Sequence, residues 1–133
     1  MIKISCAACG QILTHDGRWG DTSEWHGLAD VRCSPVANGV LVRLPEDGVA
    51  FLKGDNQSGS QVYSPEGAIS VHPEMVIREN WSPAGIDQGC CGSNGEDGPN
   101  RACTCGQLVA TEWSDCTTMA EIRFLPDAVS VSE

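Results

Sequence analysis

The chain has 133 residues, which suits one domain or two very small ones, and its eight cysteines accompany only four Trp, two Phe and one Tyr. Eighteen acidic against eight basic residues give a formal charge of −10, and no Lys/Arg cluster occurs, which excludes the positive footprint of a nucleic-acid-binding protein and favours a basic protein partner. No segment approaches the roughly 20 apolar residues of a membrane span. With so few large apolar side chains, the composition predicts that metal or covalent cross-links supply part of the stability.

The first ten residues, MIKISCAACG, contain neither a basic segment nor an apolar run of signal-peptide length, which predicts a cytoplasmic protein. Reducing cytosol disfavours structural disulfides, so clustered cysteines there more often bind metal or carry out redox chemistry. A redox Cys-x-x-Cys usually starts a helix, whereas Cys9 is followed at once by Gly10 and soon by other turn residues. Metal binding is therefore favoured, with structural disulfides as the alternative for an exported protein.

The predicted elements are short β-strands. The first leads into the Cys6-Ala-Ala-Cys9 segment, and residues 40–44 and 49–53 then flank the sequence PEDG, which predicts a hairpin turn. Pro and Gly separate the remaining predicted strands, which lie at 61–64, 68–72, 74–79, 120–125 and 128–132. No stretch of about ten or more residues has helical periodicity. The sequence therefore predicts a mainly β fold of small antiparallel strands.

Four motifs occur twice in the same order, which predicts an internal repeat. CGQIL (9–13) matches CGQLV (105–109), SEW (23–25) matches TEW (111–113), a lone cysteine follows each, and VRLPEDGVA (42–50) matches IRFLPDAVS (122–130). We expect a single domain over residues 1–133, with a first repeat at about 6–52, a connecting β segment at about 53–89 and a second repeat at about 90–131. Trp25 and Trp113 would then occupy equivalent places beside the metal sites.

The segment ISCAACGQIL resembles the zinc knuckle of zinc-ribbon and rubredoxin-like proteins. In such a knuckle two thiolates sit on a tight turn, and the glycine after the second cysteine lets the backbone bend toward the sulfurs. The second copy, Cys103-Thr-Cys105-Gly106, departs from this pattern because its cysteines are one residue closer together. The resemblance covers only the two motifs, and it implies a metal-stabilised fold with zinc as the preferred metal.

The cysteine count predicts two zinc ions. Each copy supplies a pair and a later single cysteine: Cys6, Cys9 and Cys33 in the first, and Cys103, Cys105 and Cys116 in the second. Structural zinc takes four ligands. The adjacent Cys90 and Cys91 could donate one ligand to each site, because successive side chains of an extended chain point to opposite sides. The alternatives are a single zinc ion, or His15 or His26 as the fourth ligand of the first site.

The function that these features favour is a non-catalytic protein-interaction module with structural, cysteine-bound zinc. A closed four-ligand site leaves no position for a substrate, and the histidines form no catalytic motif. Glu24 and Glu112, which precede the repeated tryptophans, are expected to lie on the surface or beside a zinc ligand rather than to act as general bases. A metal- or thiol-dependent enzyme and a metal sensor or carrier are the alternatives.

Overall fold

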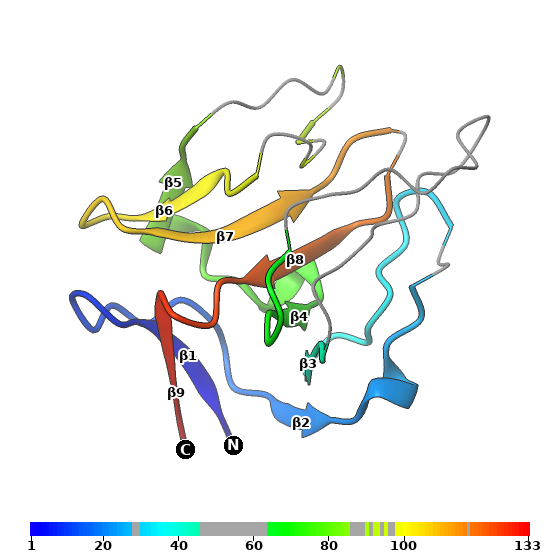
Figure 1. The fold of residues 1–133 in the computed structure, drawn as a ribbon, viewed down its shortest axis with the longest axis horizontal. Helices are drawn as coiled ribbons and strands as arrows, with labels where there is room; N and C mark the ends of the chain where they lie inside the picture. The colour runs from blue at the N-terminus through cyan, green and yellow to red at the C-terminus, as the bar shows by residue number, and fades with distance from the viewer. Residues whose placement is uncertain are drawn as a thin grey trace.

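A computed structural model describes residues 1–27, 30–45, 64–85, 90, 92–93, 95, 98–116 and 118–133 (Figure 1). Its elements are short strands and one-turn 3-10 helices: β1 (Lys3–Cys6), β2 (Arg18–Gly20), η1 (Thr22–Glu24), β3 (Val40–Arg43), β4 (Ile69–Val71), η2 (Pro73–Met75), η3 (Arg78–Asn80), β5 (Trp81–Pro83), β6 (Arg101–Cys103), β7 (Leu108–Trp113), β8 (Glu121–Phe124) and β9 (Val129–Ser132). The described residues contain no α-helix, and none of their helices has the length and apolar character needed to cross a membrane. The prediction of a mainly β fold is confirmed.

The predicted strands at 40–44, 68–72, 120–125 and 128–132 correspond to β3, β4, β8 and β9. The strand predicted at 74–79 is wrong, because this segment forms η2 and η3. Pro73 opens the first of these turns, and the His72 side chain accepts a hydrogen bond of 3.0 Å from the backbone N–H of Glu74, so a local cap replaces strand pairing. The predicted strand at 49–53 and most of the PEDG turn and of the strand at 61–64 lie outside the described residues.

The strands form two sheets (Figure 1). The larger has the order β2-β3-β4-β8-β7-β6-β5, and all its neighbours are antiparallel except the parallel pair β2–β3. The smaller pairs β1 with β9 in antiparallel fashion, from Lys3 opposite Ser132 to Cys6 opposite Val129. The first and the last strand of the chain, β1 and β9, therefore form a two-stranded sheet beside the large sheet.

The main core lies on one face of the large sheet. Ile69, Phe124 and Ala110 are partners across β4, β8 and β7, and they pack in one cluster with Ile4 of β1. The opposite face carries Ser70, Arg123 and Thr111 in the adjacent row, all buried. Since side chains alternate between the faces of a strand, the central strand β8 is buried on both sides.

The structure does not show the predicted repeat. The two knuckle turns are alike, because in each the N–H of the glycine donates to the carbonyl of the first cysteine at 2.8 Å. Beyond the turns the pairing differs, since β2 runs parallel to β3 whereas β7 runs antiparallel to β8. Trp25 follows η1 and is half-buried, whereas Trp113 ends β7 and is fully buried. The proposed repeat boundaries and the single domain stay predictions.

Candidate metal centre

The first knuckle is built by the chain reversal after β1. Cys6 ends the strand, its N–H donates to the carbonyl of Gln11 at 2.8 Å, and the chain returns to pair Ile12 with Ser5. Gly10 has a φ of 83°, a left-handed conformation that residues with a Cβ adopt at a cost. The reversal brings the thiol of Cys9 back beside the end of β1.

The second knuckle is the hairpin between β6 and β7. Cys103 ends β6, and its N–H donates to the carbonyl of Gln107 at 2.9 Å. Gly106 adopts a φ of 97°, matching the left-handed glycine of the first turn. The closer spacing of Cys103 and Cys105 is therefore compatible with a similar turn that directs both sulfurs to one side.

The two knuckles meet and form one group of four thiols, the Cys₄ cluster: Cys6, Cys9, Cys103 and Cys105. All four sulfurs lie within 4.8 Å of one another. The Sγ atoms of Cys6 and Cys105 are 3.7 Å apart, and those of Cys9 and Cys103 are 3.5 Å apart. A tetrahedral zinc ion with Zn–S bonds of about 2.3 Å holds its sulfurs about 3.8 Å apart. The donor set and the spacing therefore both suit Zn²⁺.

Burial divides the cluster into an inner and an outer half. Cys6 and Cys103 are each only 1% exposed, whereas Cys9 and Cys105 are exposed. Each close sulfur pair joins one inner to one outer cysteine and one knuckle to the other. A bound ion would consequently cross-link β1 to the β6–β7 hairpin, and with it the small sheet to the large one.

The thiols of the cluster influence one another's ionisation. Burial disfavours the Cys103 thiolate, but hydrogen bonds from the backbone N–H of Cys105 and from the neighbouring thiols outweigh it and lower the pKa of Cys103 to about 7. The backbone N–H of Gln11 favours the Cys9 thiolate, yet the contacts of Cys9 with the other thiols, Cys103 first, and the loss of some of its hydration together raise the pKa of Cys9 to about 12. The Cys103 thiolate therefore forms readily, whereas the Cys9 thiol keeps its proton near neutral pH unless a cation favours its thiolate.

Zinc binding to this cluster is expected to release protons and to weaken in acid. Cys9, with a pKa of about 12, must lose its proton to become a ligand, and protons compete with the metal for Cys103 below its pKa of about 7. Titration of zinc-free protein in weak buffer near pH 8 should show proton release, and competition with a chelator should give a lower zinc affinity near pH 6 than near pH 8. Equal affinities at the two pH values would contradict this assignment.

The other predicted ligands are arranged differently from the expectation. Cys90 and Cys116 lie together, with their Sγ atoms 3.3 Å apart, and Asp115 joins them in a second group. Cys33 is exposed and belongs to neither group. Cys91 lies outside the described residues.

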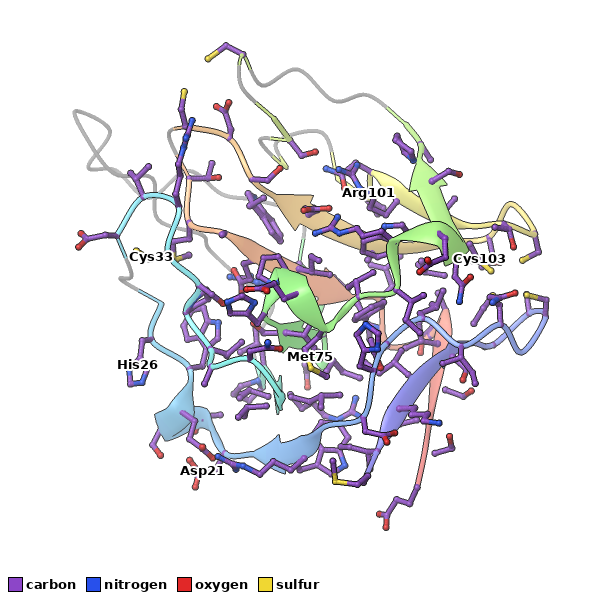
Figure 2. All side chains as sticks on the ribbon, turned by 180° about the vertical axis from the view of Figure 1, so that it is seen from behind. Asp21, His26, Cys33, Met75, Arg101 and Cys103 are labelled. Atoms are coloured by element: carbon purple, nitrogen blue, oxygen red, sulfur yellow. The ribbon has the colours of Figure 1, made fainter. Side chains whose placement is uncertain are left out.

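The partition into two sites, each headed by one knuckle, is thus wrong, because both knuckles serve one centre. Between Cys9 and Cys33 the chain passes through β2 and η1. Figure 2 shows Cys33 on the opposite side of the molecule from Cys103. The order of the cysteines along the chain therefore does not predict which of them lie together in space.

Neither histidine joins a metal group within the described residues. The backbone N–H of His15 bonds the carbonyl of Met75, and its side chain lines a shallow groove next to Cys9. The backbone N–H of His26 bonds the carbonyl of Pro35, and this residue is exposed. The alternative of a Cys₃His site finds no support here.

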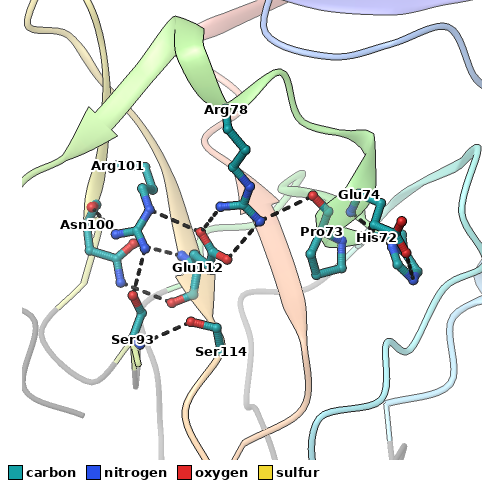
Figure 3. A network of polar contacts seen from close by, with 9 residues as sticks. All are labelled: His72, Pro73, Glu74, Arg78, Ser93, Asn100, Arg101, Glu112 and Ser114. Carbon is teal, nitrogen blue, oxygen red and sulfur yellow. Dashed lines mark hydrogen bonds and ion pairs between the residues drawn. The ribbon is translucent and has the colours of Figure 1, made fainter. Parts of the chain in front are cut away.

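The two glutamates that were weighed as general bases are engaged elsewhere. Glu24 caps η1 and binds Arg18, whose guanidinium holds the pKa of this carboxyl below its usual value. Glu112 is buried and binds two guanidinium groups, that of Arg78 at 2.7 and 3.1 Å and that of Arg101 at 3.1 Å (Figure 3). Neither belongs to a cysteine group among the described residues.

A buried ion pair lies on the opposite face of the sheet, between Arg123 and Glu121. The guanidinium carbon of Arg123 lies over the ring of Trp25, 5.4 Å from its centroid, and over that of Trp113, 5.0 Å from its centroid. Its Nε is 3.0 Å from a carboxylate oxygen of Glu121. The alternation of Glu121 and Arg123 with apolar residues is typical of a strand with one solvated face. The tryptophans, expected beside the metal sites, instead contact this arginine.

Comparisons with protein families, with curated proteins and with solved structures find no match for this chain.

Proposed function

We propose that this chain is a zinc-stabilised protein-interaction module of the cytoplasm, in which the Cys₄ cluster is a structural centre. The observation that carries the proposal is the meeting of four thiols from two knuckles at distances that suit one tetrahedral ion. Four protein ligands saturate zinc and leave no position for water or substrate, which favours a structural over a catalytic role. A thiolate centre of this kind also suits a reducing compartment.

The partner that fits best is a basic protein surface. The formal charge of −10 disfavours nucleic acid and anionic membrane surfaces, and it attracts a basic partner. Each knuckle is followed by a partly exposed apolar side chain, Ile12 at 40% and Leu108 at 38%. These two side chains, at matching positions after the two turns, would supply the apolar part of the contact.

The first test is the metal content of the purified protein. We expect one zinc equivalent to stay bound through dialysis against a weak chelator, because all four ligands come from the folded chain. Replacement of an outer ligand in Cys9→Ser should release this ion, whereas Cys33→Ser, which removes an exposed thiol outside both groups, should retain it.

Two results would contradict this proposal. Zinc below about half an equivalent, together with oxidised knuckle cysteines by mass spectrometry, would favour disulfides over a structural metal. Rapid exchange of the bound ion with isotopically labelled zinc in the folded protein would favour a sensor or carrier. The second zinc ion that the cysteine count predicts needs a different ligand set, because the first uses both knuckles.

A further inference from the structure

We propose that Cys90, Asp115 and Cys116 form a second metal site, which binds a thiophilic divalent cation such as Zn²⁺ or Cd²⁺ and keeps one coordination position open. One ligand atom from each of the three residues lies within 4.8 Å of the other two. This site goes beyond the structural centre, since it shares no residue with the knuckles.

Backbone hydrogen bonds bring the three residues together. The carbonyl of Ser93 accepts from the N–H of Ser114 at 2.7 Å and from that of Asp115 at 3.0 Å. The N–H of Ser93 in turn donates to the hydroxyl of Ser114 at 3.1 Å, and the hydroxyl of Ser93 accepts from Arg101 at 2.8 Å (Figure 3). The segment that follows Cys90 is thus attached to the turn after β7, which carries the other two ligands.

The close packing at this attachment is permitted by a glycine. A Cβ on Gly92 would lie 2.7 Å from the carbonyl oxygen of Ser114, closer than real Cβ contacts allow. Gly92 therefore lets the two backbones approach, two residues after Cys90. The juxtaposition of Cys90 with Cys116 is a built feature of the fold and does not depend on the side chains alone.

The charges of the three ligands favour a cation. Asp115 is only 4% exposed, and two thiols lie next to its carboxylate. Ionising all three groups would place three negative charges within a few ångströms in a chain that already carries −10. A divalent cation held by the three groups would offset this negative charge.

The geometry suits zinc after a small adjustment. The sulfurs of Cys90 and Cys116 are 3.3 Å apart, and a shared zinc ion would separate them to about 3.8 Å. Cys90 is exposed, so its side chain has room to make this movement. Within the part of the chain that the structure describes, two sulfurs and one oxygen give three protein ligands, the number found in zinc sites that hold water or a substrate in the fourth position.

This site is more exposed to solvent than the inner half of the Cys₄ cluster. Cys116 is half-buried and Cys90 exposed, so solvent reaches the metal directly, and only Asp115 is buried. An ion with three ligands at the surface should exchange faster and bind more weakly than one with four thiolates. The molecule would then hold one permanent and one exchangeable ion.

The test is zinc binding to the full chain, kept under reductant, with the Cys₄ cluster already occupied. Added Zn²⁺ should raise the bound metal from one to two equivalents after gel filtration, and a mild chelator should remove only the second. The Cys90→Ser and Cys116→Ser variants should each bind only one equivalent of metal. The Asp115→Asn variant should bind the second ion with an affinity at least about tenfold lower than wild type. The matched control Cys33→Ser should bind two. Cadmium in place of zinc gives an independent readout through its thiolate absorption.

Three outcomes would overturn the proposal. The first is wild-type protein that stops at one equivalent. The second is a Cys90–Cys116 disulfide in protein kept under reductant, which mass spectrometry detects as the loss of two hydrogens. The third is a Cys91→Ser variant that loses the second ion as completely as Cys90→Ser does, because four protein ligands would close the site. If Asp115→Asn fails to fold, the Cys90→Ser variant decides whether the second site exists. The Cys90 side chain is exposed, so its replacement should not disturb folding.

Discussion

Replacing Cys103 by serine is expected to release the proposed structural zinc and to leave little or no folded protein at room temperature. Cys103 is a buried cysteine of the proposed zinc site at the end of β6, and its thiol lies 3.5 Å from that of Cys9 on the other knuckle. Structural zinc in small domains contributes on the order of 10 kcal/mol to folding. Net stabilities are about 5–15 kcal/mol, so losing most of this contribution would leave little or no folded protein.

The measurement is thermal unfolding followed by circular dichroism, combined with zinc analysis of the same samples. Cys33→Ser is the matched control, because its thiol is exposed and lies outside both metal groups, and its melting temperature should stay within about 3 °C of wild type. A zinc-free Cys103→Ser protein that melts at the wild-type temperature would show that the apolar core alone holds the two sheets together.

The second large effect is expected for Arg123→Leu, which should destabilise the protein by about 3–5 kcal/mol. Glu121 is fully buried, and its Oε2 accepts hydrogen bonds from Trp25 at 2.8 Å and from Ser70 at 2.6 Å in addition to the ion pair with Arg123. Removing the guanidinium would leave a buried carboxylate without its counter-charge. The variant would also lose the two cation–π contacts with the tryptophans.

Denaturant unfolding of three variants isolates this charge effect. Adding Glu121→Gln to Arg123→Leu should restore part of the lost stability, because the uncompensated charge disappears. Arg43→Leu is the control: Arg43 also lies over an indole ring, that of Trp19 at 5.1 Å, but it is exposed, so the loss should stay below about 1 kcal/mol. Similar losses for Arg43→Leu and Arg123→Leu would contradict the assigned role of burial.

Several local features could be predicted from the sequence. Both Cys-Gly motifs form the expected tight turns, because left-handed glycines and paired thiols are encoded within a few residues. The strands β3, β4, β8 and β9 follow from apolar runs bounded by Pro and Gly. These elements depend on near neighbours in the chain, which is the information that one sequence carries most directly.

Long-range pairing could not be predicted in the same way. The assignment of Cys33 to the first knuckle used order along the chain, whereas the sheet topology brings Cys103 there instead. The sequence does not single out Asp115 as a partner of cysteines, because a carboxylate next to Cys116 is common in an acidic sequence. The alternation along β8 indicates that Glu121 and Arg123 share a face, but not that Trp25 and Trp113 cover it.

The wide sequence separation of the knuckles also sets an order of events during synthesis. The close sulfur pairs join residues that are 99 and 94 positions apart, Cys6 with Cys105 and Cys9 with Cys103. At about 5–20 residues per second, a ribosome needs roughly 5–20 s to add the second pair after the first. Throughout that interval β1 also lacks β9, its partner strand. Metal loading at the proposed Cys₄ site would therefore belong to the last stage of maturation, and a nascent chain would present Cys6 and Cys9 as an incomplete, two-ligand site.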